Sequence, residues 1–425
     1  MNYEETLEYI HCGFFGGTRP GLERVSELLE KLGNPQDRLS FIHVAGTNGK
    51  GSFCAMTDSV LRAAGYHTGL YTSPYIEKFN ERMAVDGEPI SDEELAEITS
   101  YVRPFADSMA DRPTEFELIT AVAMVYFVRH NAYPVVLEVG MGGRLDATNV
   151  IKTPVISVIT GISLDHTAIL GKTVAAIARE KAGIIRPGVP VVWGGNAGSA
   201  SRVIHSAAEK KGCECVSVRR KRVTVRSMTL DGTEFTYDGV SARLSLLGSY
   251  QPYNAANVIC AVRLLREKGF DIPDDALLSG LANAVWKARF ELISRDPVVI
   301  SDGSHNPEGI EAAIKGIHGY FGDERVVLLT GVMKDKDYPA MADALSAIAC
   351  EVYTLKPANP RALDAGLFAA EFARNGLYSE GSDTVDEAVK KAIDASVRRG
   401  VPLVSLGSLY MYGEVRSAFR KYLGK

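Results

Sequence analysis

The sequence predicts an α/β protein with mostly parallel sheets in two domains. Short apolar runs rich in β-branched residues alternate along the chain with longer segments of helical periodicity. This alternation is typical of crossover units, which build parallel sheets. A length of 425 residues exceeds that of a usual single domain, and it argues for two or three folding units. We expect a larger domain over residues 1–293 and a smaller α/β domain over residues 294–425, with the boundary near Ser294.

Eight apolar runs are predicted to be strands. Four belong to the first domain and four to the second: Phe41–Val44, Val135–Val139, Val155–Thr160 and Val189–Trp193, then Val298–Ser301, Val326–Thr330, Val352–Leu355 and Pro402–Leu406. Helices are predicted between them, one of which, Ser91–Tyr101, opens with a capping box of Ser91 and Glu94. Further helical segments are Phe53–Ala64, Val174–Ile184, Asn254–Lys268 and Ala276–Val285.

One segment departs from the α/β pattern. Residues 216–246 alternate polar and apolar side chains and contain the turn pairs Asp231-Gly232 and Asp238-Gly239. Such turns join antiparallel strands. We expect a short antiparallel meander inserted in the first domain, without a role in chemistry.

Composition and charge exclude several classes of protein. With 46% hydrophobic and 23% charged residues the chain has the composition of an ordinary globular protein. Its net charge of −5 and its lack of a dense basic stretch argue against nucleic acid as a partner. The longest apolar stretch, Leu118–Val128, has about half of the roughly 20 residues that span a bilayer, so we expect a buried helix and no membrane partner.

The location is expected to be cytoplasmic. Residues 1–10 carry three glutamates and lack the basic, apolar and small-residue order of a secretory signal. The six cysteines are irregularly spaced without paired CxxC units, and we interpret them as reduced thiols.

The strongest local signal is a glycine-rich turn between a strand and a helix. The segment His43-Val44-Ala45-Gly46-Thr47-Asn48-Gly49-Lys50-Gly51-Ser52 lets backbone N–H groups converge on an anion at a helix N-terminus. Lys50 would reach terminal phosphates, and Ser52 would serve a magnesium ion. The spacing departs from the standard Walker pattern, with Val44 in place of the first glycine and Gly51 in place of Ser/Thr. The alternative is a turn used only for tight packing.

A second signal is a carboxylate at a strand end. Glu138 follows the apolar run Val135–Leu137, which places it at the edge of the sheet where α/β proteins bind ligands. Magnesium prefers oxygen ligands and bridges carboxylates to substrate phosphates, so Glu138 and Ser73 form a candidate metal site. A structural salt bridge of Glu138, or a simple turn at Ser73-Pro74, is the alternative.

These segments resemble the ATP-dependent Mur-type ligases, in the folylpolyglutamate synthase and dihydrofolate synthase branch. The resemblance covers nearly the whole chain. It is carried by Gly46-Thr-Asn-Gly-Lys-Gly-Ser52, Gly21-Leu-Glu-Arg24, Tyr71-Thr-Ser-Pro74, Phe79-Asn-Glu-Arg82, Leu137-Glu-Val-Gly-Met-Gly-Gly-Arg-Leu-Asp-Ala-Thr-Asn149, Asp165-His166, Glu180-Lys-Ala-Gly183, Asp302-Gly-Ser-His-Asn-Pro307 and Gly407-Ser-Leu-Tyr410. It implies a P-loop-type first domain holding ATP and the folate, and a smaller Rossmann-like second domain that binds glutamate and closes over ATP.

The resemblance also implies roles for single residues. His166 becomes a third protein ligand of magnesium, and Lys181 a carbamylated lysine that holds a second magnesium ion. Buried lysines lose their proton readily, and the positions one turn from Lys181 offer no carboxylate. For His166 a structural role is the alternative, and for Lys181 an ion pair with a partner distant in sequence.

Further implied contacts are with ATP. The resemblance places the loop residues Asn48, Gly49, Lys50, Gly51 and Ser52, the adenine-segment residues Asn254 and Asn257, and Arg289, Asp302 and His305 against the nucleotide. Arg289 would clamp the transferring phosphoryl group when the domains close, with a linker salt bridge as the alternative. Lys287-Ala288 replaces the usual Pro-Gly before this arginine, which puts the local loop shape in doubt. Helix capping is the alternative for Asn254.

The folate site is implied at three positions. Arg82, Phe116 and Asp146 match residues that line the substrate pocket of similar enzymes, although Phe116 is equally suited to a core. Tyr75 replaces the histidine that usually follows Thr-Ser-Pro, so contacts of that side chain are not transferred.

The expected reaction is ATP-dependent amide formation. ATP phosphorylates the acid to an acyl phosphate, and the amine of L-glutamate then displaces phosphate, with Lys50, Arg289 and magnesium as electrostatic groups and His166 and Lys181 completing the catalytic set. The acid is a folate, dihydropteroate or both, and we expect a monomer. A muramyl peptide ligase is disfavoured, because only about 45 residues precede the loop, too few for a nucleotide-sugar domain. A P-loop phosphotransferase is the other alternative.

Overall fold

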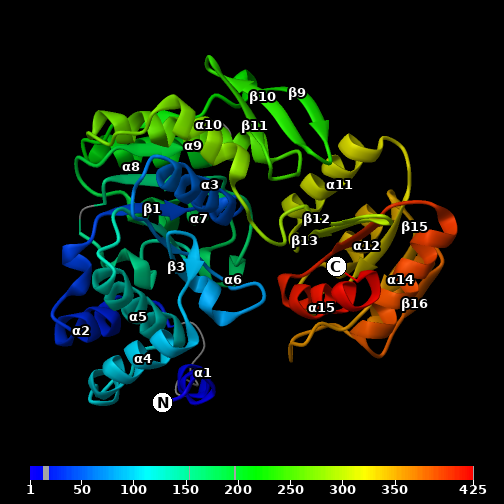
Figure 1. The fold of residues 1–425 in the computed structure, drawn as a ribbon, viewed down its shortest axis with the longest axis horizontal. Coiled ribbons are helices and arrows are strands. Elements are labelled where there is room, and N and C mark those ends of the chain that lie inside the picture. The colour runs from blue at the N-terminus through cyan, green and yellow to red at the C-terminus, as the bar shows by residue number, and fades with distance from the viewer. Residues whose placement is uncertain (13–18, 153, 196–197, 425) are drawn as a thin grey trace. The chain divides into compact units, whose positions relative to one another are not determined.

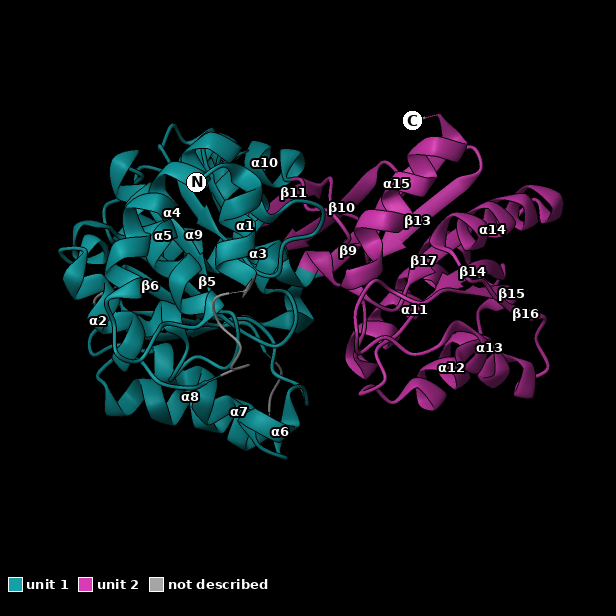
Figure 2. Ribbon diagram, turned by 90° about the horizontal axis from the view of Figure 1, so that it is seen from below, with its two compact units in different colours: residues 1–223, 253–284 teal, residues 224–252, 285–425 magenta. Residues whose placement is uncertain are grey.

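The computed structural model divides into two compact units, coloured separately in Figure 2, and describes residues 1–12, 19–152, 154–195 and 198–424. Unit 1 comprises Met1–Val223 and Tyr253–Ala284, and unit 2 comprises Thr224–Pro252 and Val285–Lys425. Both units combine helices with a mostly parallel sheet. The predicted α/β class is therefore confirmed.

Unit 1 is built on an eight-stranded sheet with the order β4-β3-β2-β5-β1-β6-β7-β8. Strands β2, β5, β1, β6, β7 and β8 pair in parallel, and β3 and β4 add an antiparallel edge. The strands are β1 (Phe41–Ala45), β2 (Gly69–Tyr71), β3 (Met83–Val85), β4 (Glu88–Pro89), β5 (Val135–Glu138), β6 (Ile156–Ile159), β7 (Val191–Trp193) and β8 (Cys215–Ser217). Val44 of β1 is in register with Glu138 of β5, so the carboxyl ends of these strands meet at one edge.

Helices connect these strands, as Figure 1 shows. They are α1 (Tyr3–Cys12), α2 (Glu23–Lys31), α3 (Lys50–Ala63), α4 (Asp92–Asp107), α5 (Glu115–Arg129), α6 (Thr167–Leu170), α7 (Val174–Lys181), α8 (Ser199–Lys210), α9 (Gln251–Glu267) and α10 (Asp274–Asn283). Ser91 caps α4 by accepting a hydrogen bond from the backbone N–H of Glu94, as predicted. Short 3-10 turns lie between some elements, among them Ala147–Val150.

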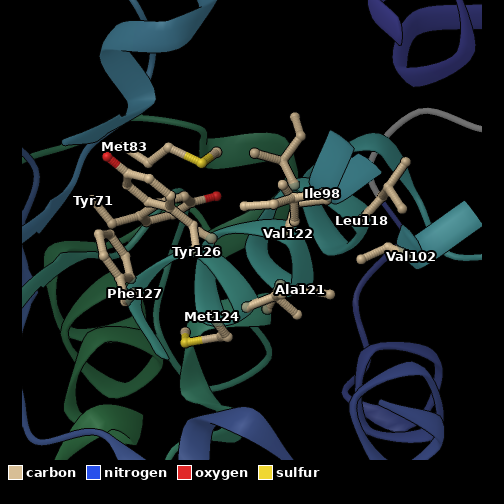
Figure 3. Packing of buried hydrophobic residues seen from close by; sticks show 14 of the residues in the cluster. Tyr71, Met83, Ile98, Val102, Leu118, Ala121, Val122, Met124, Tyr126 and Phe127 are labelled. Carbon is tan, nitrogen blue, oxygen red and sulfur yellow. The ribbon is translucent and has the colours of Figure 1, made fainter. Parts of the chain in front are cut away.

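Helix α5 contributes many residues to a hydrophobic core of unit 1. Leu118 and Val122 of α5 pack with Tyr71, Met83 and residues of α4 in the cluster shown in Figure 3. A capping box of Thr114 and Glu117 opens the helix. The predicted buried helix is confirmed, and no helix in the described part of the chain is long and apolar enough to span a bilayer.

Unit 2 contains two sheets. The three-stranded antiparallel sheet has the order β11-β10-β9, and the six-stranded sheet has the order β12-β13-β17-β14-β15-β16. The latter is parallel except for β12, which pairs antiparallel with β13. The elements are β9 (Thr224–Thr229), β10 (Gly232–Tyr237), β11 (Val240–Leu244), β12 (Glu291–Arg295), β13 (Val298–Asp302), α11 (Pro307–Phe321), β14 (Val326–Thr330), α12 (Tyr338–Ser346), β15 (Ala349–Thr354), α13 (Ala365–Arg374), β16 (Ser379–Gly381), α14 (Val385–Arg399), β17 (Leu403–Leu406) and α15 (Tyr412–Leu423).

The grouping of the meander differs from the expectation. It was expected inside the first domain, with the boundary near Ser294, whereas β9–β11 and residues 285–293 group with unit 2. The reason lies in their contacts. The backbone N–H of Gly248 donates to the Tyr320 hydroxyl at 2.9 Å, Arg295 pairs with Asp231 at 2.5 Å, and Leu230 packs on the unit 2 core.

Candidate active site

A glycine-rich loop joins β1 to α3 and forms the centre of the candidate site. Gly49 has a φ of 87° at the N-cap of α3, and Lys50 is the first residue of the helix. A Cβ at Gly46 would lie 1.9 Å from the Thr160 hydroxyl oxygen. The same hydroxyl donates to the carbonyl of Asn48 at 2.8 Å. The loop is thus held against the end of β6, and it leads into the N-terminus of α3, a type of position that is suited to an anion.

Lys50, Glu138 and Ser73 lie together at the edge of the sheet. The Lys50 ammonium is 3.8 Å from a carboxylate oxygen of Glu138. The other carboxylate oxygen accepts a hydrogen bond from the backbone N–H of Ser73 at 3.2 Å. Glu138 and Ser52 are buried. A buried carboxylate beside a phosphate-type loop fits a magnesium ion, which prefers oxygen ligands.

Lys181 lies beside the loop at the end of α7. Its side chain is 4% exposed, and its ammonium donates to the carbonyl of Gly46 at 2.6 Å. Burial, with a smaller contribution from the charge of Lys50, lowers the pKa of Lys181 to about 7. The sequence alternative of an ordinary ion pair on the surface is therefore wrong.

His166 stands at the N-cap of the short helix α6. It has a φ of 48°, and its backbone N–H donates to the Asp165 carboxylate at 2.9 Å. Its ring lies 3.9 Å from the same carboxylate, and about half of the side chain is exposed. The exposed ring makes His166 the most accessible of the predicted metal ligands. Among the described residues, no group of three His, Cys, Asp or Glu side chains is arranged to hold a metal ion.

Asn254 and Asn257 face the loop and β7 from α9. Asn254 lies inside the helix as its fourth residue, so the capping alternative is wrong. A Cβ at Gly49 would lie 2.5 Å from the Asn254 amide oxygen, which places this side chain against the phosphate loop. Asn257 abuts Gly194, and its buried amide oxygen has no hydrogen-bond partner among the described residues.

Asp146 is buried and locally satisfied. Its carboxylate accepts hydrogen bonds from the Thr148 hydroxyl at 2.6 Å and from the backbone N–H groups of Thr148 and Met141. Burial raises the pKa of Asp146, and these hydrogen bonds oppose that shift. The Thr148 hydroxyl also contacts a ring nitrogen of His43, 2.9 Å away. Asp146 therefore shapes the turn after β5.

Phe116 and Arg82 line the region in front of this turn. Phe116 packs on Gly140, where a Cβ would lie 2.6 Å from the ring, and on Tyr71 with 6.1 Å between ring centroids. The Arg82 guanidinium lies over the rings of Tyr75 and Phe79, at 5.2 and 5.4 Å. Its buried Nε has no hydrogen-bond partner in the described residues. Arg82 and Phe79 are buried, and Tyr75 is the exposed member of this cationic and aromatic group.

Three predicted residues belong to unit 2. Arg289 lies in the segment before β12, and its Nη1 donates to the Ala288 carbonyl at 3.2 Å. Asp302 ends β13, and His305 follows it, with a ring nitrogen 2.8 Å from the carbonyl of Gly303. Asp302 is buried and accepts hydrogen bonds from the Tyr250 hydroxyl and the backbone N–H of Phe290, at 2.9 and 2.8 Å.

Sequence reasoning missed some residues that shape this site. Thr160 holds the loop through the hydrogen bond from its hydroxyl to the Asn48 carbonyl. It is the last residue of a predicted strand, and this position could have marked it as a site residue. Tyr250 and Glu291 hold the segment around Arg289. No sequence motif marks Tyr250 or Glu291, because the groups that they bind are distant in the sequence or belong to the backbone.

Two family models match the chain. The Mur ligase middle domain matches residues 44–262, and the Mur ligase glutamate ligase domain matches residues 288–409. The chain belongs to the Mur ligase family. The middle-domain match contains the loop, Glu138, Lys181 and Asn254 of this Mur ligase, and the second match contains Arg289, Asp302 and His305.

Relatives over the full length identify the branch. The chain is 37% identical to the dihydrofolate synthase/folylpolyglutamate synthase of Bacillus subtilis, with 98% of this chain and 99% of the relative covered. It is 38% identical to the folylpolyglutamate synthase of Lacticaseibacillus casei, with 98% of each covered. This Mur ligase therefore belongs to the folylpolyglutamate synthase and dihydrofolate synthase branch.

Solved structures agree in fold. The folylpolyglutamate synthase of Thermotoga maritima matches with a TM-score of 0.86 and 32% identity, over 100% of this chain and 97% of that one. A folylpolyglutamate synthase complex with AMPPCP and folate matches with a TM-score of 0.85 and 36% identity over 100% of both chains. The folylpolyglutamate synthase of Mycobacterium tuberculosis, complexed with ADP and AMPPCP, matches with a TM-score of 0.88 and 28% identity, over 100% of this chain and 99% of that one.

Proposed function

We propose that the protein ligates L-glutamate to a folate, to dihydropteroate or to both, in an ATP-dependent reaction. The observation that carries the proposal is the full-length similarity, 37% and 38%, to enzymes named for these activities. The group formed by Lys50, Ser73 and the buried Glu138 beside the loop supports it, since phosphoryl transfer needs such charges.

The proposed chemistry begins at the acid. A carboxylate oxygen of the folate or pteroate attacks the γ-phosphorus of ATP, so that ADP leaves and an acyl phosphate forms. The amine of glutamate then attacks the acyl carbon, a proton is lost from nitrogen, and phosphate leaves. Lys50 and Arg289 stabilise charge on the transferring phosphoryl group. Asn48, Gly49, Gly51 and Ser52 hold the phosphates through the loop.

The side chains at and near the loop are suited to binding a magnesium ion. We propose Glu138, Ser73, Ser52 and His166 as its protein ligands, because hydroxyl, carboxylate and imidazole donors stand at or near the loop. When bound, the ion neutralises phosphate charge.

Lys181 is proposed to carry a carbamate that serves a second ion. A pKa of about 7 leaves an appreciable fraction of the amine uncharged near neutral pH, and an uncharged amine adds carbon dioxide. The deeply buried position beside Gly46 supports this role. Mass spectrometry at low and high bicarbonate, without acid treatment, tests it: a reversible gain of one carbon dioxide at Lys181 is expected.

The remaining predicted contacts are proposed as follows. Asn254, Asn257, Asp302 and His305 bind the nucleotide, and Arg82 and Phe116 line the folate site, with Asp146 shaping its wall. The aromatic rings beside Arg82 support the folate site, since a flat ring needs an apolar slot with polar edges. A monomer in the cytoplasm is proposed as well.

One set of assays tests the function. Purified protein receives ATP and magnesium with dihydropteroate or tetrahydrofolate, each with and without L-glutamate. ADP release that needs both the acid and glutamate is expected, and oxygen-18 from a labelled acid carboxylate should appear in the released phosphate. ADP release without glutamate would instead indicate a phosphotransferase or a simple ATPase.

A further inference from the structure

The segment that carries Arg289 has an unusual backbone. Ala288 has a φ of 53° and Phe290 a φ of 50°, so two residues other than glycine adopt the left-handed conformation on either side of Arg289. A side chain at Cβ disfavours this conformation. Two such residues persist only where surrounding contacts hold them, and such positions cluster at functional sites.

A carboxylate holds the first of these residues. Glu291 accepts a hydrogen bond from the backbone N–H of Ala288 at 2.9 Å. The same carboxylate is anchored on α15, where the Tyr412 hydroxyl donates to it at 2.5 Å and Arg416 lies 3.4 Å away. Glu291 thus ties the residue before Arg289 to a helix of unit 2.

A second carboxylate holds the other residue. Asp302 accepts from the backbone N–H of Phe290, from the Tyr250 hydroxyl and from the backbone N–H of Ser304 at 2.8 Å. The Ala288 carbonyl accepts from the backbone N–H of Gly303 at 2.9 Å. The Phe290 ring is fully buried and stacks on Tyr320 with 5.1 Å between centroids. The backbone on both sides of Arg289 is therefore held by hydrogen bonds, and the Arg289 guanidinium donates to the Ala288 carbonyl at 3.2 Å.

We infer that Glu291 is a positioning residue for Arg289: with Tyr412 and Arg416 it holds Ala288 in the left-handed conformation that aims the guanidinium. The inference rests on the proposed function, in which Arg289 stabilises the transferring phosphoryl group. The Glu291 carboxylate is engaged by Ala288, Tyr412 and Arg416. Its loss acts through Arg289 and lowers kcat, because a charge that stabilises the transition state is misplaced.

The test compares kinetics of variants of the full chain. Glu291→Gln is expected to lower kcat by about 10- to 100-fold, as a misplaced catalytic group commonly does, with little change in KM for ATP. Ala288→Gly should restore part of the lost kcat in the Glu291→Gln background, since glycine adopts a positive φ without a Cβ penalty. Asp231→Asn is the matched control, because Asp231 pairs with the exposed Arg295 on the same strand β12, and it should leave kcat unchanged.

Arg289→Ala separates this inference from the proposed function. If Glu291 acts through Arg289, adding Glu291→Gln to Arg289→Ala lowers kcat no further. An Arg289→Ala enzyme with normal kcat would refute the role of Arg289 in the proposed function. Two outcomes would overturn the inference and leave the proposed function intact. One is a low kcat for Arg289→Ala together with a normal kcat for Glu291→Gln. The other is an equal loss of kcat from Glu291→Gln with and without Arg289.

A milder variant covers the case in which Glu291→Gln does not fold. Tyr412→Phe removes only the hydroxyl that anchors the Glu291 carboxylate. Tyr412→Phe should lower kcat several-fold when Arg289 is present and should leave kcat unchanged in the Arg289→Ala background. An unchanged kcat for a folded Tyr412→Phe enzyme, with thermal unfolding like the wild type, would count against the inference.

Discussion

Lys50 carries a positive charge into a partly enclosed site whose nearest fixed negative charge is the Glu138 carboxylate, 3.8 Å away. We predict that Lys50→Ala lowers turnover by on the order of 10²-fold, because one preorganised charge contact to the reacting phosphoryl group is lost. The steady-state rate of ADP release, with the acid substrate and glutamate present, measures this turnover. Lys31→Ala is the control, since Lys31 pairs with Glu27 at 3.7 Å in α2. Near-normal turnover of Lys50→Ala would remove the loop lysine from the mechanism.

His43 gives unit 1 a specific sensitivity to acid. The side chain is fully buried in β1, and burial, with a smaller contribution from the charge of Arg186, lowers the pKa of His43 to about 3. The ring is thus neutral in the folded protein and takes up a proton on unfolding below about pH 6.5. Its contribution to stability is complete above pH 6.5 and declines as the pH falls towards 3.

We predict that His43→Gln weakens this dependence. Between pH 7 and pH 5.5 the wild type should lose about 1 kcal/mol more of its free energy of unfolding than the variant, since one proton contributes up to about 1.4 kcal/mol per pH unit. Urea unfolding at the two pH values measures the difference. The exposed His205→Gln serves as control and should follow the wild type. An equal loss in His43→Gln would show that His43 titrates normally in the folded state.

Single residues of the site were predictable when they stood at strand ends. Lys50, Ser73 and Glu138 were predicted together, and the structure brings them together because their strands run in parallel to one edge. The cation and ring contacts of Arg82 were not predictable, because Tyr75 and Phe79 approach it through a loop whose path no periodic pattern specifies.

At the scale of elements, helix α10 supports the helix that follows the phosphate loop. Gly280 of α10 packs so closely on α3 that a Cβ there would lie 2.4 Å from the Cα of Val60. The Ser59 hydroxyl donates to the Gly280 carbonyl at 2.8 Å. The two helices therefore meet backbone against backbone.

We predict that Gly280→Ala destabilises the protein by about 1–3 kcal/mol, because the added methyl group forces the helices apart. Gly366→Ala in α13 is the matched control. A Cβ there meets only the Asp364 carboxylate oxygen, at 3.2 Å, and alanine favours a helix. Denaturant unfolding compares the two. If Gly280→Ala were as stable as Gly366→Ala, the close contact of α10 with α3 would be refuted.

Long buried strands were predictable and very short strands were not. β1, β5, β6 and β14 are buried along their whole length and appear in the sequence as continuous apolar runs. β2 and β3 have three residues each, and β4 has two exposed ones. Segments this short carry no periodic signal, so the antiparallel edge of the first sheet was not foreseen.

At the scale of the whole molecule, nucleotide binding should be coupled to stability. We predict that magnesium with the analogue AMPPCP, at about 100 times its Kd, raises the free energy of unfolding by about 2.7 kcal/mol, because the analogue binds the folded protein alone. Thermal unfolding with and without the analogue measures the gain. Lys50→Ala at the same analogue concentration should show a smaller gain. No gain in the wild type would contradict nucleotide binding.

The division of the chain between units was only partly predictable. The change of pattern after residue 216 marked the meander. The pair Asp238-Gly239 lies between β10 and β11 as predicted, whereas of Asp231-Gly232 only Asp231 lies in the turn and Gly232 begins β10. Its membership in unit 2 depends on Tyr320 and Arg295, which lie more than 60 residues away in sequence. Contacts at such separation leave no local pattern.

The interleaving of the units has a consequence during synthesis on the ribosome. The Ser59–Gly280 hydrogen bond joins residues 221 positions apart, a stretch that takes roughly 10 to 40 s to translate at about 5–20 residues per second. During that interval α3, the helix that follows the phosphate loop, cannot pack against α10. Strands of unit 2 also emerge before unit 1 is complete. We therefore expect the nascent chain to expose the apolar surface of α3 for tens of seconds.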